Sequence, residues 1–289
     1  MLSRSDAKNS SDARESTLTR RVGLVLDQMN AHPERPHTND SLAEVASFSP
    51  YHFNRIFRHL IGVPPARYLS ALRIEKAKRL LLTTDASVTD ICYSVGYSSL
   101  GTFITRFTHL VGFSPNALRH AAGEFDVAQL ERGCSAQSRP QPRGAPGSAI
   151  CGRIEGQKGV SGAIFVGLFE SVVPDAGPHA CQILAAPGDF ALGPVADGTS
   201  YYVAAVCVPW SGDAARILAP DMWRAQAGPI RTVRGTGVYE VALTLRAPAP
   251  WDPPILAALP LLLARSLRAA PGGAGTSIET MEVPRVENR

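Results

Sequence analysis

Cysteine is scarce in this chain of 289 residues, and the five that occur are odd in number and widely spaced. They form no CxxC pair and no Cys/His cluster with the spacing of metal ligands. The pattern therefore indicates neither a disulfide framework nor a metal site. We expect small buried thiols in a reducing compartment.

Long apolar runs are also missing. The most apolar stretch, "PPILAALPLLLAR" at 253–265, is too short to cross a bilayer and is broken by Pro260. The polar start, "MLSRSDAKNSSDARESTLTR", lacks the apolar segment of a signal peptide. We therefore expect a cytoplasmic protein that does not contact a membrane.

Catalytic motifs are absent as well, since the chain contains no G-x-S-x-G, HExxH or Cys/His arrangement. Its second half holds candidate acids and bases outside any such motif: Asp175, His179, Asp189, Asp197, Asp213 and Glu240. We predict no catalytic residue and no cofactor. An enzyme is the alternative, and it requires a titrating pair that this pattern does not provide.

The composition and periodicity of the sequence change along the chain. Residues 1–17 are expected to be a disordered lead, and residues 18–122 show apolar spacing near 3.6 with capping signals, which predicts an all-α domain. A Pro/Gly/Ser-rich stretch makes 123–149 a linker. Alternating β-branched and aromatic runs between Pro/Gly turns predict a mainly β domain over 150–250. An apolar segment and a polar tail follow at 251–289.

The net positive charge lies on the predicted helical domain. Residues 18–122 hold 12 Lys and Arg against 7 Asp and Glu, together with six of the seven histidines. From residue 150 onward the count is 11 against 12. This distribution favours a polyanionic partner for the first domain.

A short module occurs twice in that domain, as "SPYHFNRIFRHLIG" at 49–62 and "SSLGTFITRFTHLVG" at 98–112. The residues that recur are Phe53, Phe57, His59, Leu60, Gly62 and Pro65, matched by Phe103, Phe107, His109, Leu110, Gly112 and Pro115. We interpret the apolar members as core and the two histidines as partly buried.

The first copy has the pattern of a helix-turn-helix. Ser41 with Glu44 resembles a capping box that begins a short helix, and Ser49 before Pro50 begins a second one, which ends at Gly62. Such a pair of helices, with one polar face exposed, fits the major groove of DNA.

The second copy repeats these signals. Ser87 and Asp90 provide the cap, Gly96 the turn, and Ser99 the start of the exposed helix. Between the copies, residues 65–83 form one strongly periodic helix, with a basic flank of Arg73, Lys76 and Arg79. A rigid connector of this kind would set the separation of two recognition helices.

The exposed face of the first module carries Tyr51, Asn54 and Arg55, with Arg58 one turn on. Asn can pair with adenine and Arg with guanine through two hydrogen bonds, and Tyr can meet a thymine methyl group or a phosphate. The alternative is a helical hairpin whose polar residues are solvated and bind no DNA, and the duplication argues against it.

Residues 18–122 resemble the DNA-binding domain of the AraC/XylS family of bacterial transcription regulators. The resemblance includes the stretch "VTDICYSVGYSSLGTFITRFTHLVGFSPNALR" in the second half. It implies seven helices, binding to asymmetric promoter DNA and action on RNA polymerase. It further implies base-facing roles for Tyr51, Asn54 and Arg55, and phosphate contacts for His52 and Arg58.

The second module departs from the usual polar choices. The base-facing positions are Gly101, Ile104 and Thr105, with Ser99 and Thr102 beside them. Glycine and isoleucine side chains make no directional hydrogen bond to a base, although Ile104 could contact a thymine methyl group. Our hypothesis is that the first module discriminates bases and the second mainly clamps the DNA backbone.

The segment "PGDFALGPVADGTSYYVAAV" resembles small β-sandwiches of the transthyretin or carboxypeptidase-regulatory type. A GyrI-like effector domain is the alternative, and the absence of long helices between the strands speaks against it. In a regulator such a domain would sense a small-molecule effector or mediate association. The overall prediction is a sequence-specific transcription regulator, with a non-specific architectural DNA-binding protein as the alternative.

Overall fold

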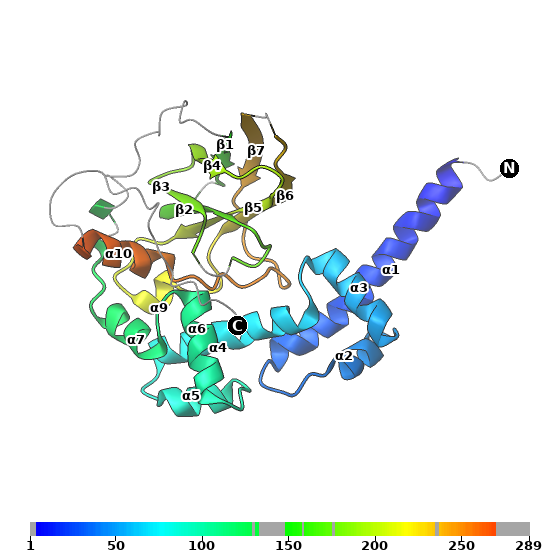
Figure 1. The fold of residues 1–289 in the computed structure, drawn as a ribbon, viewed down its shortest axis with the longest axis horizontal. Helices are drawn as coiled ribbons and strands as arrows, with labels where there is room; N and C mark the ends of the chain where they lie inside the picture. The colour runs from blue at the N-terminus through cyan, green and yellow to red at the C-terminus, as the bar shows by residue number, and fades with distance from the viewer. Residues whose placement is uncertain are drawn as a thin grey trace.

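The computed structural model has a helical N-terminal part and a mainly β C-terminal part, which pack against each other (Figure 1). For residues 4–14 and 266–269 the structure describes the backbone and not the side chains. The structure describes residues 4–128, 131–132, 148–157, 159–174, 177–234 and 237–269.

The helical part consists of two pairs of helices joined by a long connecting helix (Figure 1). The pairs are α2 with α3 and α5 with α6, and α4 runs between them. The helices are α1 (Arg4–Ala31), α2 (Asn39–Val45), α3 (Pro50–Ile61), α4 (Pro65–Thr83), α5 (Val88–Ser94), α6 (Leu100–Val111) and α7 (Pro115–Gly123). This confirms the helices predicted over 18–122.

Helix α1 corrects the prediction at the N-terminus. Residues 4–17, expected to be a disordered lead, form the first half of this 28-residue helix. They lack an apolar stripe, but they include alanine, arginine, lysine and glutamate, whose helix propensity is high. Most of the predicted linker, 129–130 and 133–147, lies outside the described residues, as does the tail from 270 onward.

The repeat in the sequence is a repeat in the structure. Helices α3 and α6 have 12 residues each, and both end at a glycine in the left-handed region, Gly62 with φ 84° and Gly112 with φ 85°. The two phenylalanine rings within each helix have their centroids 5.6 Å apart in both copies. Both copies therefore bury the same apolar stripe and turn in the same way into the next helix.

Thr38 caps α2, and the prediction that Ser41 caps it is wrong by three residues. The Thr38 hydroxyl accepts from the Ser41 backbone N–H, and the Ser41 hydroxyl accepts from the Thr38 backbone N–H, both at 3.1 Å. Serine at the third helical position thus takes the reciprocal role that Glu44 was expected to play. The caps predicted at Ser87 and Ser99 are confirmed, each accepting from the backbone N–H three residues on.

The predicted core is largely confirmed, with differences at its edge. Leu42, Phe53, Phe57, Phe103 and Phe107 are fully buried or nearly so. The two histidines of the repeat, expected to be partly buried, are exposed. They occupy the last turn of α3 and α6, where the side chain turns outward.

The four described cysteines are free. Cys92 and Cys207 are buried, and burial raises the pKa of both thiols, which makes them poor nucleophiles at neutral pH. The described residues contain no group of three or more metal-binding side chains. Within the described chain, no helix combines the length and apolarity needed to cross a membrane.

The loop between α1 and α2 is fastened to α4. The Arg73 guanidinium donates to the backbone carbonyls of Pro33 at 2.7 Å and Arg35 at 2.9 Å. Lys76 Nζ lies 2.8 Å from a Glu34 carboxylate oxygen, and this hydrogen bond lowers the pKa of Glu34 to about 2. Two members of the predicted basic flank are therefore engaged inside the protein.

The same loop touches the second helix pair at Gly96. This residue has φ 89° in the turn between α5 and α6, and a Cβ there would lie 2.5 Å from the Glu34 carbonyl oxygen. The α1–α2 loop is thus enclosed between α4 and the turn of the second pair. We call these contacts of Glu34, Arg73, Lys76 and Gly96 the loop clamp.

The β part contains two sheets. One has the order β4-β1-β7 and the other β3-β2-β5-β6, and residues of both contribute to one apolar cluster. Strand β1 is antiparallel to β4 and parallel to β7. The strands are β1 (Ser148–Glu155), β2 (Ala163–Phe169), β3 (Ala180–Leu184), β4 (Asp189–Val195), β5 (Ser200–Val208), β6 (Arg224–Arg231) and β7 (Val238–Thr244).

The helices of the β part are few. Between the described strands lies only the four-residue helix α9 (Ala214–Ile217), while α10 (Leu259–Ala269) follows the last strand. This agrees with the predicted scarcity of long helices between strands.

The two parts share a continuous apolar core. Its buried residues come from α1 to α7 and also from strands β2, β3 and β5 and from helix α10. The contacts reach the ends of both repeated helices, because Val172 lies against Gly62 and Leu262 against Gly112. The Ala258 N–H also donates to the Val111 carbonyl at 3.1 Å. The β part therefore covers the C-terminal ends of α3 and α6.

A buried charge lies in this contact. Lys78 is 2% exposed, and its Nζ lies 2.7 Å from Glu75 and donates to the Ile255 carbonyl at 2.8 Å. A buried ammonium group is tolerated only when such partners replace its water. Residue 255 lies between the last strand and α10, so this contact binds the C-terminal segment to α4.

Two glycines provide a matched test of the loop clamp. We expect Gly96→Ala to destabilise the protein by about 1–3 kcal/mol, because alanine is strained at positive φ and its methyl group would overlap the Glu34 carbonyl. Gly101→Ala, in helix α6 with no described atom within 4 Å of the added methyl group, should stabilise it by about 0.5–1 kcal/mol. Urea unfolding of both variants measures the difference. Equal effects of the two substitutions would contradict the described contact.

Candidate nucleic-acid interface

Helix α3 exposes a polar face. Tyr51 is 83% exposed, a high value for an aromatic side chain, and Arg55 and Arg58 are also exposed. His52 is half-buried with its ring edge against Phe48, and an Arg55 Nη lies 3.3 Å from its Nδ1. Arg55 is thereby oriented by its own helix and still faces solvent.

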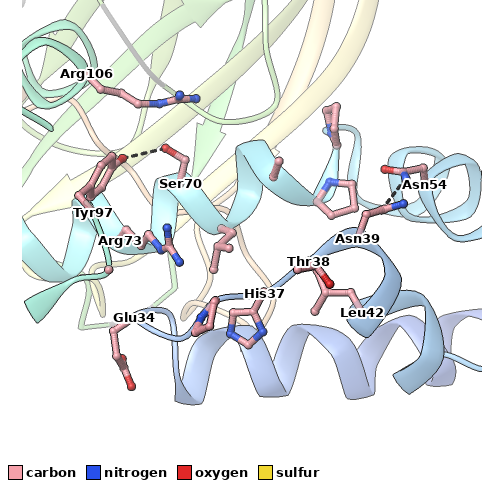
Figure 2. A pocket seen from close by; sticks show the side chains of 16 residues that line it. Glu34, His37, Thr38, Asn39, Leu42, Asn54, Ser70, Arg73, Tyr97 and Arg106 are labelled. Atoms are coloured by element: carbon pink, nitrogen blue, oxygen red, sulfur yellow. Dashed lines mark hydrogen bonds between the residues drawn. The ribbon is translucent and has the colours of Figure 1, made fainter. Parts of the chain in front are cut away.

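Asn54 is not free in this state. Its side-chain amide donates to the Asn39 side-chain oxygen at 2.5 Å (Figure 2). It also donates to the Pro50 carbonyl at 3.2 Å. Asn39 is the first residue of α2, so this bond ties the two helices of the first pair together. The Asn54 amide oxygen has no hydrogen-bond donor among the described residues.

Helix α6 exposes small and apolar side chains at the corresponding positions. Gly101, Thr102 and Thr105 are exposed, and Ile104 is 37% exposed. The Ser99 hydroxyl accepts from the Thr102 backbone N–H at 3.3 Å and lies 3.2 Å from the Thr102 hydroxyl. Both hydroxyl groups thus belong to the cap at the helix N-terminus.

The two faces differ in charge. The exposed face of α3 carries Arg55 and Arg58, whereas the predicted contact positions of α6 carry no charged side chain. The β part contacts the C-terminal ends of the two helices at Gly62, Val111 and Gly112, and the side chains at the predicted contact positions are exposed or half-buried. The structure therefore brings the first set of predicted residues together on α3 and the second set on α6, with both sets accessible.

Asp175, one of the candidate acids of the β part, lies outside the described residues, and two of the other candidates belong to separate ion pairs. His179 pairs with Glu170 at 2.7 Å on the surface, and Asp189 pairs with Arg153 at 3.1 Å on another sheet. The tryptophans are dispersed, since Trp223 packs in the β core, Trp251 donates to Asp27 of α1, and Trp210 is 37% exposed.

Two residues at this surface were not predicted from the sequence. Asn39 was missed because nothing in the chain pattern indicates its bond to Asn54. Arg106 is exposed on α6, and it could have been found by aligning the two copies, which places it opposite Ile56. Both line a groove of about 660 Å³ between α3 and α6.

Residues 42–121 match the family model of a helix-turn-helix domain. The chain is 35% identical over 105 residues to the HTH-type transcriptional activator RhaS of Escherichia coli (strain SE11), covering 36% of this chain and 38% of RhaS. It is 31% identical over 98 residues to the bifunctional transcriptional activator/DNA repair enzyme AdaA of Bacillus subtilis (strain 168), covering 34% of this chain and 46% of AdaA. The chain thus spans less than half the length of either relative.

Among solved structures, a transcriptional regulator from Chromobacterium violaceum, described as having an AraC-type DNA-binding domain, is 25% identical with a TM-score of 0.34. The match covers 35% of this chain and 91% of that one. The family model identifies residues 42–121 of the helical part as a helix-turn-helix domain.

Proposed function

We propose that the protein is a sequence-specific transcription regulator that binds promoter DNA through α3 and α6, each lying in the major groove. The observation that carries this proposal is the repeated pair of helices, with its buried stripe retained and its outer face exposed in both copies. Tyr51, Asn54 and Arg55 contact bases from α3, and His52 and Arg58 contact phosphates. Gly101, Ile104 and Thr105 face the DNA from α6, with Ser99 and Thr102 at the backbone.

The connecting helix supports this arrangement. Helix α4 has 19 residues, which corresponds to about 28 Å at 1.5 Å per residue. Successive major-groove segments on one face of DNA are about 34 Å apart. A stiff helix of comparable length between the two pairs, together with the loop clamp, supports binding of both pairs to a single duplex. One chain then binds an asymmetric site without a dimer.

The β part has a regulatory role in this proposal. Its two sheets form a sandwich that senses a small-molecule effector or mediates association, in a cytoplasmic protein whose other partner is RNA polymerase. Its contacts with Gly62 and Gly112 support the proposal, because any rearrangement there reaches both DNA-contacting helices directly.

Selection of bound fragments from a random DNA library with the full chain tests the function. We expect an enriched site with a more informative half, contacted by α3, and a less informative half, contacted by α6. The reason is that α6 presents no charged side chain at its base-facing positions. Enrichment of no sequence would favour the architectural alternative, and two equally informative halves would contradict the division of roles.

Substitution of Arg55 is the most direct single test of base recognition. If its guanidinium pairs with a guanine, Arg55→Ala should cost about 1–3 kcal/mol at the selected site and relax the preference at one base pair. Titration of the selected site and its single-base variants, followed by fluorescence anisotropy, measures both effects. Arg79→Ala is the control, since Arg79 is an exposed arginine of α4 in a separate hollow facing residues 248–254. A uniform loss across all variants would instead identify Arg55 as a phosphate contact.

A further inference from the structure

The two copies of the repeat differ by an exchange of arginine between neighbouring positions. One residue before the second phenylalanine of each helix, α3 has Ile56 and α6 has Arg106. At the preceding position the arginine is in the other helix, because α3 has Arg55 and α6 has Thr105. One residue corresponds to about 100° around a helix, so the guanidinium group of α6 has moved away from the base-facing side.

The burial of these two positions also differs. Ile56 is 6% exposed and belongs to the core, whereas Arg106 is exposed. In Figure 2 the Arg106 side chain extends from α6 over helix α4, into the groove between the two pairs. Asn54 of α3 lines the same groove from the other end.

The groove is built from both pairs and from the helix that joins them. Ser70 and Arg73 of α4 line it together with Tyr97, which follows the turn of the second pair, and the Tyr97 and Ser70 hydroxyl groups lie 3.1 Å apart. The groove therefore has a polar lining at the point where α4 passes between the two helices.

Its charged groups are already paired, with one exception. Arg73 donates to two backbone carbonyls of the α1–α2 loop, and Glu34 is paired with Lys76. Arg106 makes no hydrogen bond or ion pair with any residue that the structure describes. A single unpaired guanidinium in a polar groove favours an anionic ligand.

We infer that this groove is a third DNA-contact site, which holds the sugar-phosphate backbone of the duplex between its two major-groove segments, with Arg106 binding a phosphate. The inference rests on the proposed function. A duplex in contact with both Asn54 and α6 has to cross the groove that lies between them. Arg106 lies one residue beyond the base-facing position, which suits a backbone contact and not base readout.

The test uses the full chain and the site selected with it. A protein loses about 0.9 in the slope of log K against log salt for each phosphate contact removed. We therefore expect Arg106→Ala to reduce the slope by about 0.9, so that the affinity lost between 50 and 200 mM salt is about 3.5-fold smaller than for the unaltered protein. The loss should be the same for the selected site and its single-base variants. Arg106→Lys should retain the slope, and Arg79→Ala is the matched control.

Chemically altered DNA makes the test independent of folding. Uncharged methylphosphonate groups in place of the phosphates between the two half-sites should weaken binding of the unaltered protein. They should leave binding of the Arg106→Ala variant unchanged, because that variant has no guanidinium group to contact these phosphates. An unchanged salt slope, a loss confined to one base pair, or additive effects of the two alterations would each overturn the inference. Failure of the unaltered protein to select any DNA would instead overturn the proposed function.

Discussion

The relative placement of α3 and α6 depends on the connection through α4 and on the loop clamp. A connecting helix fixes a distance, but it does not by itself fix the rotation of the pairs at its two ends. The clamp supplies a second connection, because the α1–α2 loop is bonded to Arg73 and Lys76 on α4 and lies against Gly96 in the second pair. Within the clamp, the hydrogen bond from Lys76 lowers the pKa of the Glu34 carboxyl to about 2, which favours its charged form. For the proposed binding of both pairs to one duplex, this second connection would hold α3 and α6 in a fixed relative orientation.

The β part is joined to the helices by a shared core and not only by a tether. Apolar residues of β2, β3, β5 and α10 belong to the same cluster as the phenylalanines of the repeat. Lys78, buried and bonded to the Ile255 carbonyl, would lose this acceptor if the parts separated and would keep only its ion pair with Glu75 of the same helix. Regulation in this protein would therefore act through adjustments within one packed body, at the C-terminal ends of the helices whose opposite faces are exposed.

Much of the helical part could be predicted because its signals are local. Glycines at 62 and 112, prolines at 65 and 115 and the paired phenylalanines mark the same turns and the same buried face in both copies. The bond of Asn54 to Asn39 could not be predicted in this way, because it joins residues 15 positions apart. Two local features also differ from the prediction: Thr38 caps α2 in place of Ser41, and α1 extends through residues expected to be disordered. The shared core was also not predicted. The change of residue pattern near residue 150 indicates a boundary along the chain, but it does not show which residues pack across that boundary. Arg106 was a different case, since aligning the copies position by position shows its exchange with Ile56.

The proposed function requires α3 and α6 to face one side of a single duplex. Hydroxyl-radical footprinting of the full chain on its selected site tests this most directly, because it maps the protected backbone at single-nucleotide resolution. We predict protected stretches on one face of the helix, centred about one turn, or 10–10.5 base pairs, apart. Protection of a single groove, or of two stretches on opposite faces of the duplex, would contradict the account.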